Sequence, residues 1–82
     1  MDTSMLLGSV VLSLCGRDKG RMLVVVGIID DSYVYVADGR LRRVESPKRK
    51  KIKHIKPVGN AVLNSEEFTN RCIRAFIAES DG

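Results

Sequence analysis

The sequence predicts a small, mainly β protein: a compact antiparallel barrel followed by a C-terminal α-helix. Three observations lead there. The chain has only 82 residues, its valine-rich runs are separated by glycine-containing turns, and one segment near the C-terminus has helical periodicity. A chain of this size forms one domain with a thin core. We expect a frayed lead-in at residues 1–5, a barrel with a basic tail strand at residues 6–58, and a linker turn with a helix at residues 59–79.

Residues 8–14 and 21–29 are the first two predicted strands, because both are apolar and rich in β-branched side chains. A charged turn at residues 16–20 joins them. Gly16 and Gly20 bracket this turn, and glycine readily takes the positive φ that a sharp turn needs. We therefore expect Arg17 and Lys19 to be displayed outward at the bend.

Alternation in the first strand predicts one core-facing set and one half-exposed set. The core-facing residues would be Val10, Leu12 and Leu14, and the half-exposed ones Ser9, Val11 and Ser13. In the second strand, residues 23–26 run without a polar break, which predicts that both faces are covered. Gly27 interrupts the run and indicates a β-bulge.

A hairpin is predicted next. Residues 30–32 form a turn, and residues 33–37 a third strand with Val34 and Val36 on one face. Asp38-Gly39 is a typical hairpin turn, with Gly39 supplying the positive φ. Residues 40–44 then return as a fourth strand whose outer face is basic.

Pro47 ends that strand, because proline lacks a backbone donor for the ladder. Residues 48–51 form a charge run to which we assign no core role. Residues 52–57 are expected to form a short edge strand that its lysines protect from pairing with other chains. Residues 59–60 form the linker turn.

The final element is a predicted helix that runs to about Ala78 and packs on the sheet, with Ser80 in the tail. Asn64 is the expected N-cap, Glu67 is placed to reach back to it, and Leu63 with Phe68 would form a hydrophobic staple. The apolar stripe consists of Phe68, Cys72, Ala75 and Phe76, widened by Ile73 and Ile77.

The charge distribution points to a polyanionic partner. The formal net charge is +4, and most of the cations lie between residues 40 and 56, where only Glu45 opposes them. They are Arg40, Arg42, Arg43, Lys48, Arg49, Lys50, Lys51, Lys53 and Lys56. RNA, DNA or an anionic membrane surface would suit such a cluster, and we favour nucleic acid. The competing interpretation is a solvated charged loop.

Metal, cofactor and export signals are weak. Cys15, Cys72 and His54 lack the paired spacing of a zinc site, so we expect no metal and no cofactor. Both cysteines are interpreted as small buried apolar residues in a reducing cytoplasm. Residues 12–15 loosely resemble a lipoprotein processing site, but Asp2 stands where a secretory segment is positive. No stretch is long enough to be a transmembrane helix.

Residues 8–11, 16–20 and 24–26 resemble the KOW family of ribosomal proteins and transcription-elongation factors. Residues 36–40 and 47–54 look like the small bacterial KOW proteins akin to certain large-subunit ribosomal proteins. The resemblance covers roughly residues 6 to 57 and implies an SH3-like barrel that binds RNA, often ribosomal RNA. Gly20 matches the key glycine of the motif, placed where a side chain would obstruct the turn, and Lys19 matches its frequent lysine. Leu23 departs from the motif, which often has a second glycine there.

The predicted function is therefore a non-catalytic, cytoplasmic RNA-binding protein, associated with the ribosome in translation, that reads structured RNA through a basic rim of the barrel. The candidate RNA contacts are Arg17, Lys19, Arg21, Arg40, Arg42, Arg43, Lys48, Arg49, Lys50, Lys51, Lys53 and His54. Asp18 is expected to pin Arg17 or Lys19, or to accept turn amides. Tyr33 and Tyr35 could stack on bases, although we favour a role in covering the core or the helix.

Two other functions stay open at this point. The alternative is an SH3-like interaction module that binds a partner protein or self-associates through its C-terminal helix. Residues 47–53 are also compatible with a nuclear import signal. An enzyme built on Cys15 or Ser13 beside His54 has no supporting motif. We expect no membrane partner.

Overall fold

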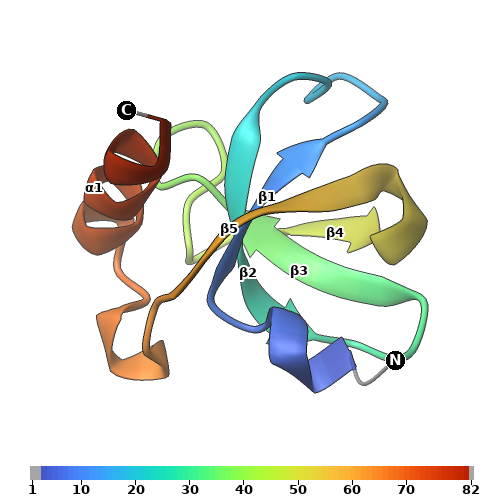
Figure 1. Cartoon of the computed structure of the whole chain (residues 1–82), viewed down its shortest axis with the longest axis horizontal. Coiled ribbons are helices and arrows are strands. Elements are labelled where there is room, and N and C mark those ends of the chain that lie inside the picture. The colour runs from blue at the N-terminus through green and yellow to red at the C-terminus, as the bar shows by residue number, and fades with distance from the viewer. Residues whose placement is uncertain (1–2, 82) are drawn as a thin grey trace.

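The computed structural model describes residues 3–81 and contains five strands and one α-helix (Figure 1). The strands are β1 (Ser9–Ser13), β2 (Met22–Ile28), β3 (Tyr33–Ala37), β4 (Lys48–Lys51) and β5 (Ile55–Val62). Three 3-10 helices, η1 (Thr3–Leu6), η2 (Ile52–His54) and η3 (Ser65–Glu67), precede the helix α1 (Asn70–Asp81). Within this part of the chain, no helix has the length and apolar character that crossing a membrane requires.

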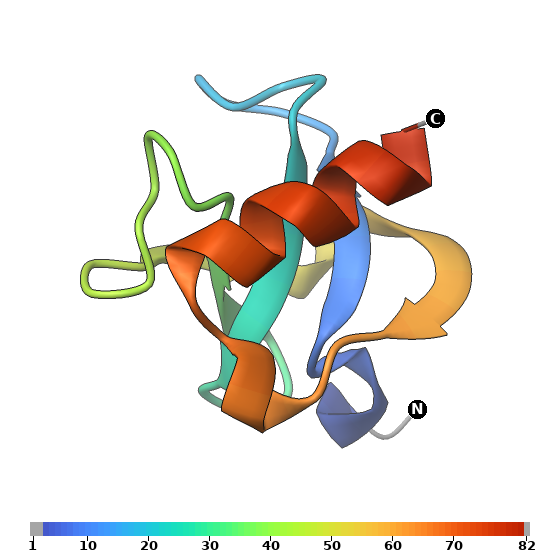
Figure 2. The same cartoon turned by 90° about the vertical axis from the view of Figure 1, so that its left-hand side faces the viewer.

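All five strands belong to one antiparallel sheet in the order β4-β3-β2-β1-β5. The sheet curls strongly, and α1 lies across its outer side (Figure 2). The mainly β architecture with a C-terminal helix confirms the predicted fold class and is consistent with an SH3-like barrel of the KOW type. Five strands in this order leave β4 and β5 as the two edges of the sheet.

Two apolar clusters share the central strands, and successive residues of β2 point into them alternately. Leu23 and Val25 join the cluster inside the curled sheet, whereas Val24 joins the cluster between the sheet and α1. The inner cluster also holds Val11, Val34, Val36 and Ile55, and the outer one Val10, Ala37, Leu63 and Ile73. The prediction that both faces of residues 23–26 are covered is confirmed, as is the bulge, because the β2–β3 register shifts between Val25 and Gly27.

The predicted inward face of β1 is wrong. Val11 and Ser13 are buried, whereas Leu12 is only half-buried and Leu14 is 43% exposed. Val10 is buried too, on the side that α1 covers. Because both faces of β1 are covered over most of its length, apolar residues occur at consecutive positions and the alternation no longer identifies the core side.

The turn between β1 and β2 forms as predicted. Gly16 and Gly20 have φ values of 84° and 87°, and the Gly20 N–H donates to the Ser13 carbonyl at 2.9 Å. A Cβ built on Gly20 would meet nothing within 4 Å. The glycine is therefore needed for its backbone conformation, and the implied obstruction by a side chain is not the reason.

The predicted fourth strand at residues 40–44 is wrong, because residues 38–47 form a loop. A carboxylate oxygen of Asp38 accepts the backbone N–H groups of Arg40 and Arg42 at 2.8 and 2.9 Å. The Asp38 side chain thus binds amides that a strand would offer to its neighbour. Gly39 has a φ of 80°, and a Cβ there would lie 2.4 Å from the Asn70 carbonyl oxygen, so this loop packs tightly against the start of α1.

The strand that pairs with β3 is formed by the charge run at residues 48–51, which is β4, and not by residues 40–44. Residues 52–54 form η2 where the start of an edge strand was predicted, and β5 begins at Ile55. The predicted linker turn at residues 59–60 lies inside β5, at an irregularity where the register passes from Val11 opposite Pro57 to Ser9 opposite Val62. Gly59, with a φ of 73°, supports this bend.

The helix starts later than predicted. Residues 65–67 form only the single turn η3, and α1 begins at Asn70 after Thr69, whose hydroxyl oxygen accepts the Cys72 N–H at 3.2 Å. Leu63 and Phe68 do pack in the same apolar cluster, as the staple requires. Ile73, fully buried, lies at the centre of the contact face.

Both termini differ from the prediction as well. Residues 3–6 form η1 where a frayed lead-in was expected, and α1 extends past Ala78 and Ser80 to Asp81. Met1, Asp2 and Gly82, which belong to the predicted lead-in and tail, lie outside the described residues.

Candidate nucleic-acid interface

The predicted RNA contacts fall on three segments, and Asp18 joins two of them. The segments are the knuckle loop (residues 14–21), the loop at residues 38–47, and β4 with η2. Asp18 is buried in the knuckle loop, where its carboxylate pairs with the ammonium group of Lys48 at the start of β4. Lys50 and Arg42 are also close enough to lower the pKa of Asp18. Asp18 was expected to pin Arg17 or Lys19 or to accept turn amides. Its carboxylate instead pairs with Lys48 and joins the knuckle loop to β4.

Strand alternation divides the charge run of β4 between two environments. Lys48 and Lys50 are opposite Val36 and Val34, whose side chains are in the inner cluster. Lys50 is only 7% exposed, and its ammonium group donates to the Cys15 carbonyl at 2.8 Å. Arg49 and Lys51 are opposite Tyr35 and Tyr33 on the outer side. The expectation that this run has no core role is therefore wrong for Lys50.

We predict that Lys50→Ala destabilises the fold by about 1–3 kcal/mol, because it removes a side chain that is only 7% exposed together with its charged hydrogen bond to the half-buried Cys15 carbonyl. Lys51→Ala is the matched control on the same strand and should change the free energy of unfolding by less than about 0.5 kcal/mol. Urea denaturation followed by circular dichroism measures both. Equal effects of the two substitutions would contradict the assignment of Lys50 to the interior.

The pair between Asp18 and Lys48 also makes stability depend on pH. The hydrogen bond from Lys48 holds the pKa of Asp18 below its ordinary value, against the opposing effect of burial. A carboxyl whose pKa is lower in the folded state contributes stability above its unfolded pKa, and loses it as the pH falls through the folded pKa. We predict that Asp18→Asn costs about 1–2 kcal/mol at neutral pH, and that its difference from the wild type shrinks below about pH 4. Urea titrations of both proteins across this range measure the difference, and a constant difference would contradict the prediction.

The outer face of β3 and β4 combines aromatic and cationic side chains. It consists of Tyr33, Tyr35, Arg49 and Lys51, which we call the β3–β4 outer face. The Arg49 guanidinium carbon lies 4.9 Å from the centre of the Tyr33 ring, and the Lys51 nitrogen lies 5.9 Å from it. Tyr35 is 42% exposed and packs over Gly27, whose missing side chain leaves room for the ring. The favoured expectation that these tyrosines cover the core or the helix is wrong, since Val34 and Val36 take the inward positions.

The loop at residues 38–47 is attached to α1 by polar contacts. The Asn70 side chain accepts the Val44 N–H at 2.9 Å and donates to the Glu45 carboxylate at 3.0 and 3.1 Å. This amide, together with Arg43 at 3.5 Å, holds the pKa of Glu45 below its usual range. Arg40 is exposed and Arg42 half-buried. Of the predicted contacts here, Arg43 already has an acidic partner within its own loop.

The remaining predicted contacts are at the surface or near it. Arg17, Lys19, Arg21 and Lys53 are exposed, and the His54 side chain is half-buried while its carbonyl accepts the Leu14 N–H at 2.8 Å. Cys15 and Cys72 are free and half-buried rather than fully buried as expected. Across residues 3–81, no group of three or more His, Cys, Asp or Glu side chains is placed to hold a metal ion.

Comparison with known proteins adds a direct indication of ancestry. No protein-family model matches the chain. Large ribosomal subunit protein eL14 of Pyrobaculum arsenaticum is 34% identical over 56 residues, which is 68% of this chain and 54% of that protein. The eL14 of Staphylothermus marinus is 29% identical over 74 residues, or 90% of this chain and 77% of that protein.

The chain is a distant homologue of archaeal eL14. It spans about half the length of the Pyrobaculum relatives that it matches. The long alignment to the Staphylothermus protein covers most of the chain and not only the stretch with the resemblance to the KOW family.

Sequence reasoning missed two parts of this interface. It did not pair Asp18 with Lys48, 30 residues away, and it did not place the tyrosines beside Arg49 and Lys51. Strict alternation within residues 48–51 would have separated Lys48 and Lys50 from Arg49 and Lys51. It could not have shown which set faces the core, because every residue of the run is cationic.

Proposed function

We propose that this protein is a non-catalytic component of the large ribosomal subunit or of its assembly intermediates, and that it binds ribosomal RNA. The observation that carries this proposal is the distant homology to large ribosomal subunit protein eL14. A ribosomal role would place the protein in the cytoplasm. The resemblance to the KOW family supports the same class of ligand.

The proposed RNA-binding surface consists of cations on the knuckle loop and on the outer side of β4 and η2, all of them exposed except the half-buried Lys51. Its residues are Arg17, Lys19, Arg21, Arg49, Lys51 and Lys53. The two ion pairs found within residues 3–81 use Arg43 and Lys48, so neither neutralises a cation of this surface. Each of these cations can therefore neutralise a phosphate and release its counterions. We leave Lys50 out of the surface because it is buried, and Lys48 because Asp18 already neutralises it.

Crosslinking of the protein to RNA in cells, followed by sequencing of the bound fragments, tests the proposal. We expect large-subunit ribosomal RNA to dominate the fragments, and the protein to sediment with large subunits or their precursors at low salt. If about five phosphates are contacted, affinity should fall roughly 500-fold between about 50 and 200 mM salt. Recovery of a protein partner without ribosomal RNA would overturn the proposal and favour an SH3-like interaction module.

A further inference from the structure

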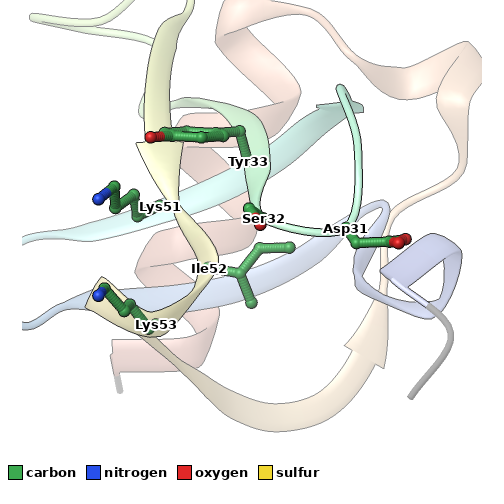
Figure 3. Close-up of a pocket in the computed structure, with 6 residues that line it drawn as sticks. All are labelled: Asp31, Ser32, Tyr33, Lys51, Ile52 and Lys53. Atoms are coloured by element: carbon green, nitrogen blue, oxygen red, sulfur yellow. The ribbon is translucent and has the colours of Figure 1, made fainter.

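A hollow of about 390 Å³ lies where β3 begins and β4 ends, beside the β3–β4 outer face (Figure 3). Six residues line it: Asp31, Ser32, Tyr33, Lys51, Ile52 and Lys53. They come from the turn before β3, the end of β4 and the start of η2. This volume is within the range typical of sites for single small molecules. It is too small to admit a nucleic-acid duplex.

The frame of the hollow is held by one backbone hydrogen bond and by two hydrogen bonds to the Asp30 side chain. The Ile52 N–H donates to the Ser32 carbonyl at 2.8 Å, which closes β4 onto the turn. A carboxylate oxygen of Asp30 accepts the N–H groups of Ser32 and Tyr33 at 2.8 and 2.9 Å. These bonds fix the point at which the Tyr33 side chain leaves the backbone. The hollow is therefore formed before any ligand arrives.

The side chains offer one flat aromatic surface, one aliphatic contact and two positive charges. Figure 3 shows the Tyr33 ring edge-on above Ile52. Lys51 and Lys53 both lie to the left of Ile52 in this view, and Asp31 points to the right, away from the two lysines. The Arg49 guanidinium packs 4.9 Å from the ring centre and helps to hold the ring in place. An aromatic ring favours stacking with a planar group, and ammonium groups favour phosphate oxygens.

We propose that this hollow receives one unpaired nucleotide of the bound RNA. The base stacks on Tyr33 and contacts Ile52, while Lys51 and Lys53 bind the phosphates on either side of it. This inference rests on the proposed function, and it adds that the RNA must present an extruded base at this point. A base within a paired stem cannot do so, because its faces are covered by its neighbours in the stack.

Fluorescence anisotropy with two RNA hairpins tests the proposal. One hairpin has a fully paired stem, and the other has the same stem with a single unpaired 2-aminopurine. The wild-type protein should prefer the bulged hairpin, and the 2-aminopurine fluorescence should be quenched on binding. Tyr33→Leu should weaken binding to the bulged hairpin roughly 10-fold or more and abolish the quenching. It should change binding to the paired hairpin by less than about twofold.

Two variants serve as controls. Tyr33→Phe keeps the ring and should retain both the preference and the quenching. Tyr35→Leu removes the other tyrosine of the β3–β4 outer face, which does not line the hollow, and should leave the preference intact. Thermal unfolding of each variant shows that the sheet is formed.

The outcomes separate this inference from the proposed function. Salt-dependent binding of both hairpins with equal affinity would overturn the unpaired-nucleotide site and leave the RNA-binding role standing. Equal weakening of both hairpins by Tyr33→Leu would also overturn the site, since it would show a general role of the ring. Absence of salt-dependent binding to either hairpin and to large-subunit ribosomal RNA would overturn both.

Discussion

Replacing Arg17 and Lys19 together by glutamine should weaken binding to large-subunit ribosomal RNA roughly 30- to 60-fold at about 0.1 M salt. Both side chains are exposed on the knuckle loop, on either side of the buried Asp18. Each lost phosphate contact removes one set of released counterions, so the slope of log affinity against log salt should become shallower by about 2. Filter binding over a series of salt concentrations measures both quantities.

The matched control replaces Lys56 and Arg71 by glutamine. Both are exposed, on β5 and α1 respectively, and lie outside the proposed surface. This variant has the same net charge as the first one, and its affinity should change by less than about threefold. Equal losses in the two variants would mean that only net charge attracts RNA, and the proposed surface would then be wrong.

Ile73→Ala should lower the free energy of unfolding by about 2–5 kcal/mol, because it removes a fully buried side chain from the cluster between the sheet and α1. In a domain of this size such a loss is a large fraction of the total stability. Urea denaturation followed by circular dichroism measures the change. A small loss at Ile73 would mean that α1 contributes little to the fold.

Ile29→Ala is the matched control, since Ile29 is 38% exposed directly after β2 and the same atoms are removed. We expect it to cost less than about 1 kcal/mol. Comparable losses at the two positions would contradict the central role of Ile73. Ile73 is part of the cluster between the sheet and α1 and is not a residue of the proposed RNA surface. A folded Ile73→Val variant should therefore bind RNA as the wild type does.

The fold class could be predicted because its signals are local. Valine-rich runs favour strands, and Gly16 and Gly20 bracket a turn that only a positive φ allows. The unbroken apolar run of β2 showed that both of its faces are covered, which requires a second layer such as α1. These features depend on composition and spacing within a few residues.

The errors occurred where a side chain competes with the backbone or where distant segments meet. Asp38 accepts the amides of Arg40 and Arg42, so a hairpin signal led into a loop instead of a strand. Thr69 caps α1, whereas Asn64 precedes the single turn η3 and its side chain caps nothing there, although both residue types are good caps. Neither outcome follows from residue preferences alone.

By itself the sequence determined a small β domain with a terminal helix, a turn bracketed by glycines and a strong excess of positive charge in residues 40–56. Only the tertiary structure decided which of those charges face the solvent. The pairing of β4 with β3 turns Lys50 inward beside Val34 and sets Arg49 and Lys51 beside two tyrosines. The physical reason is that alternation along a strand separates two faces, while the core against which the strand packs determines which face is buried.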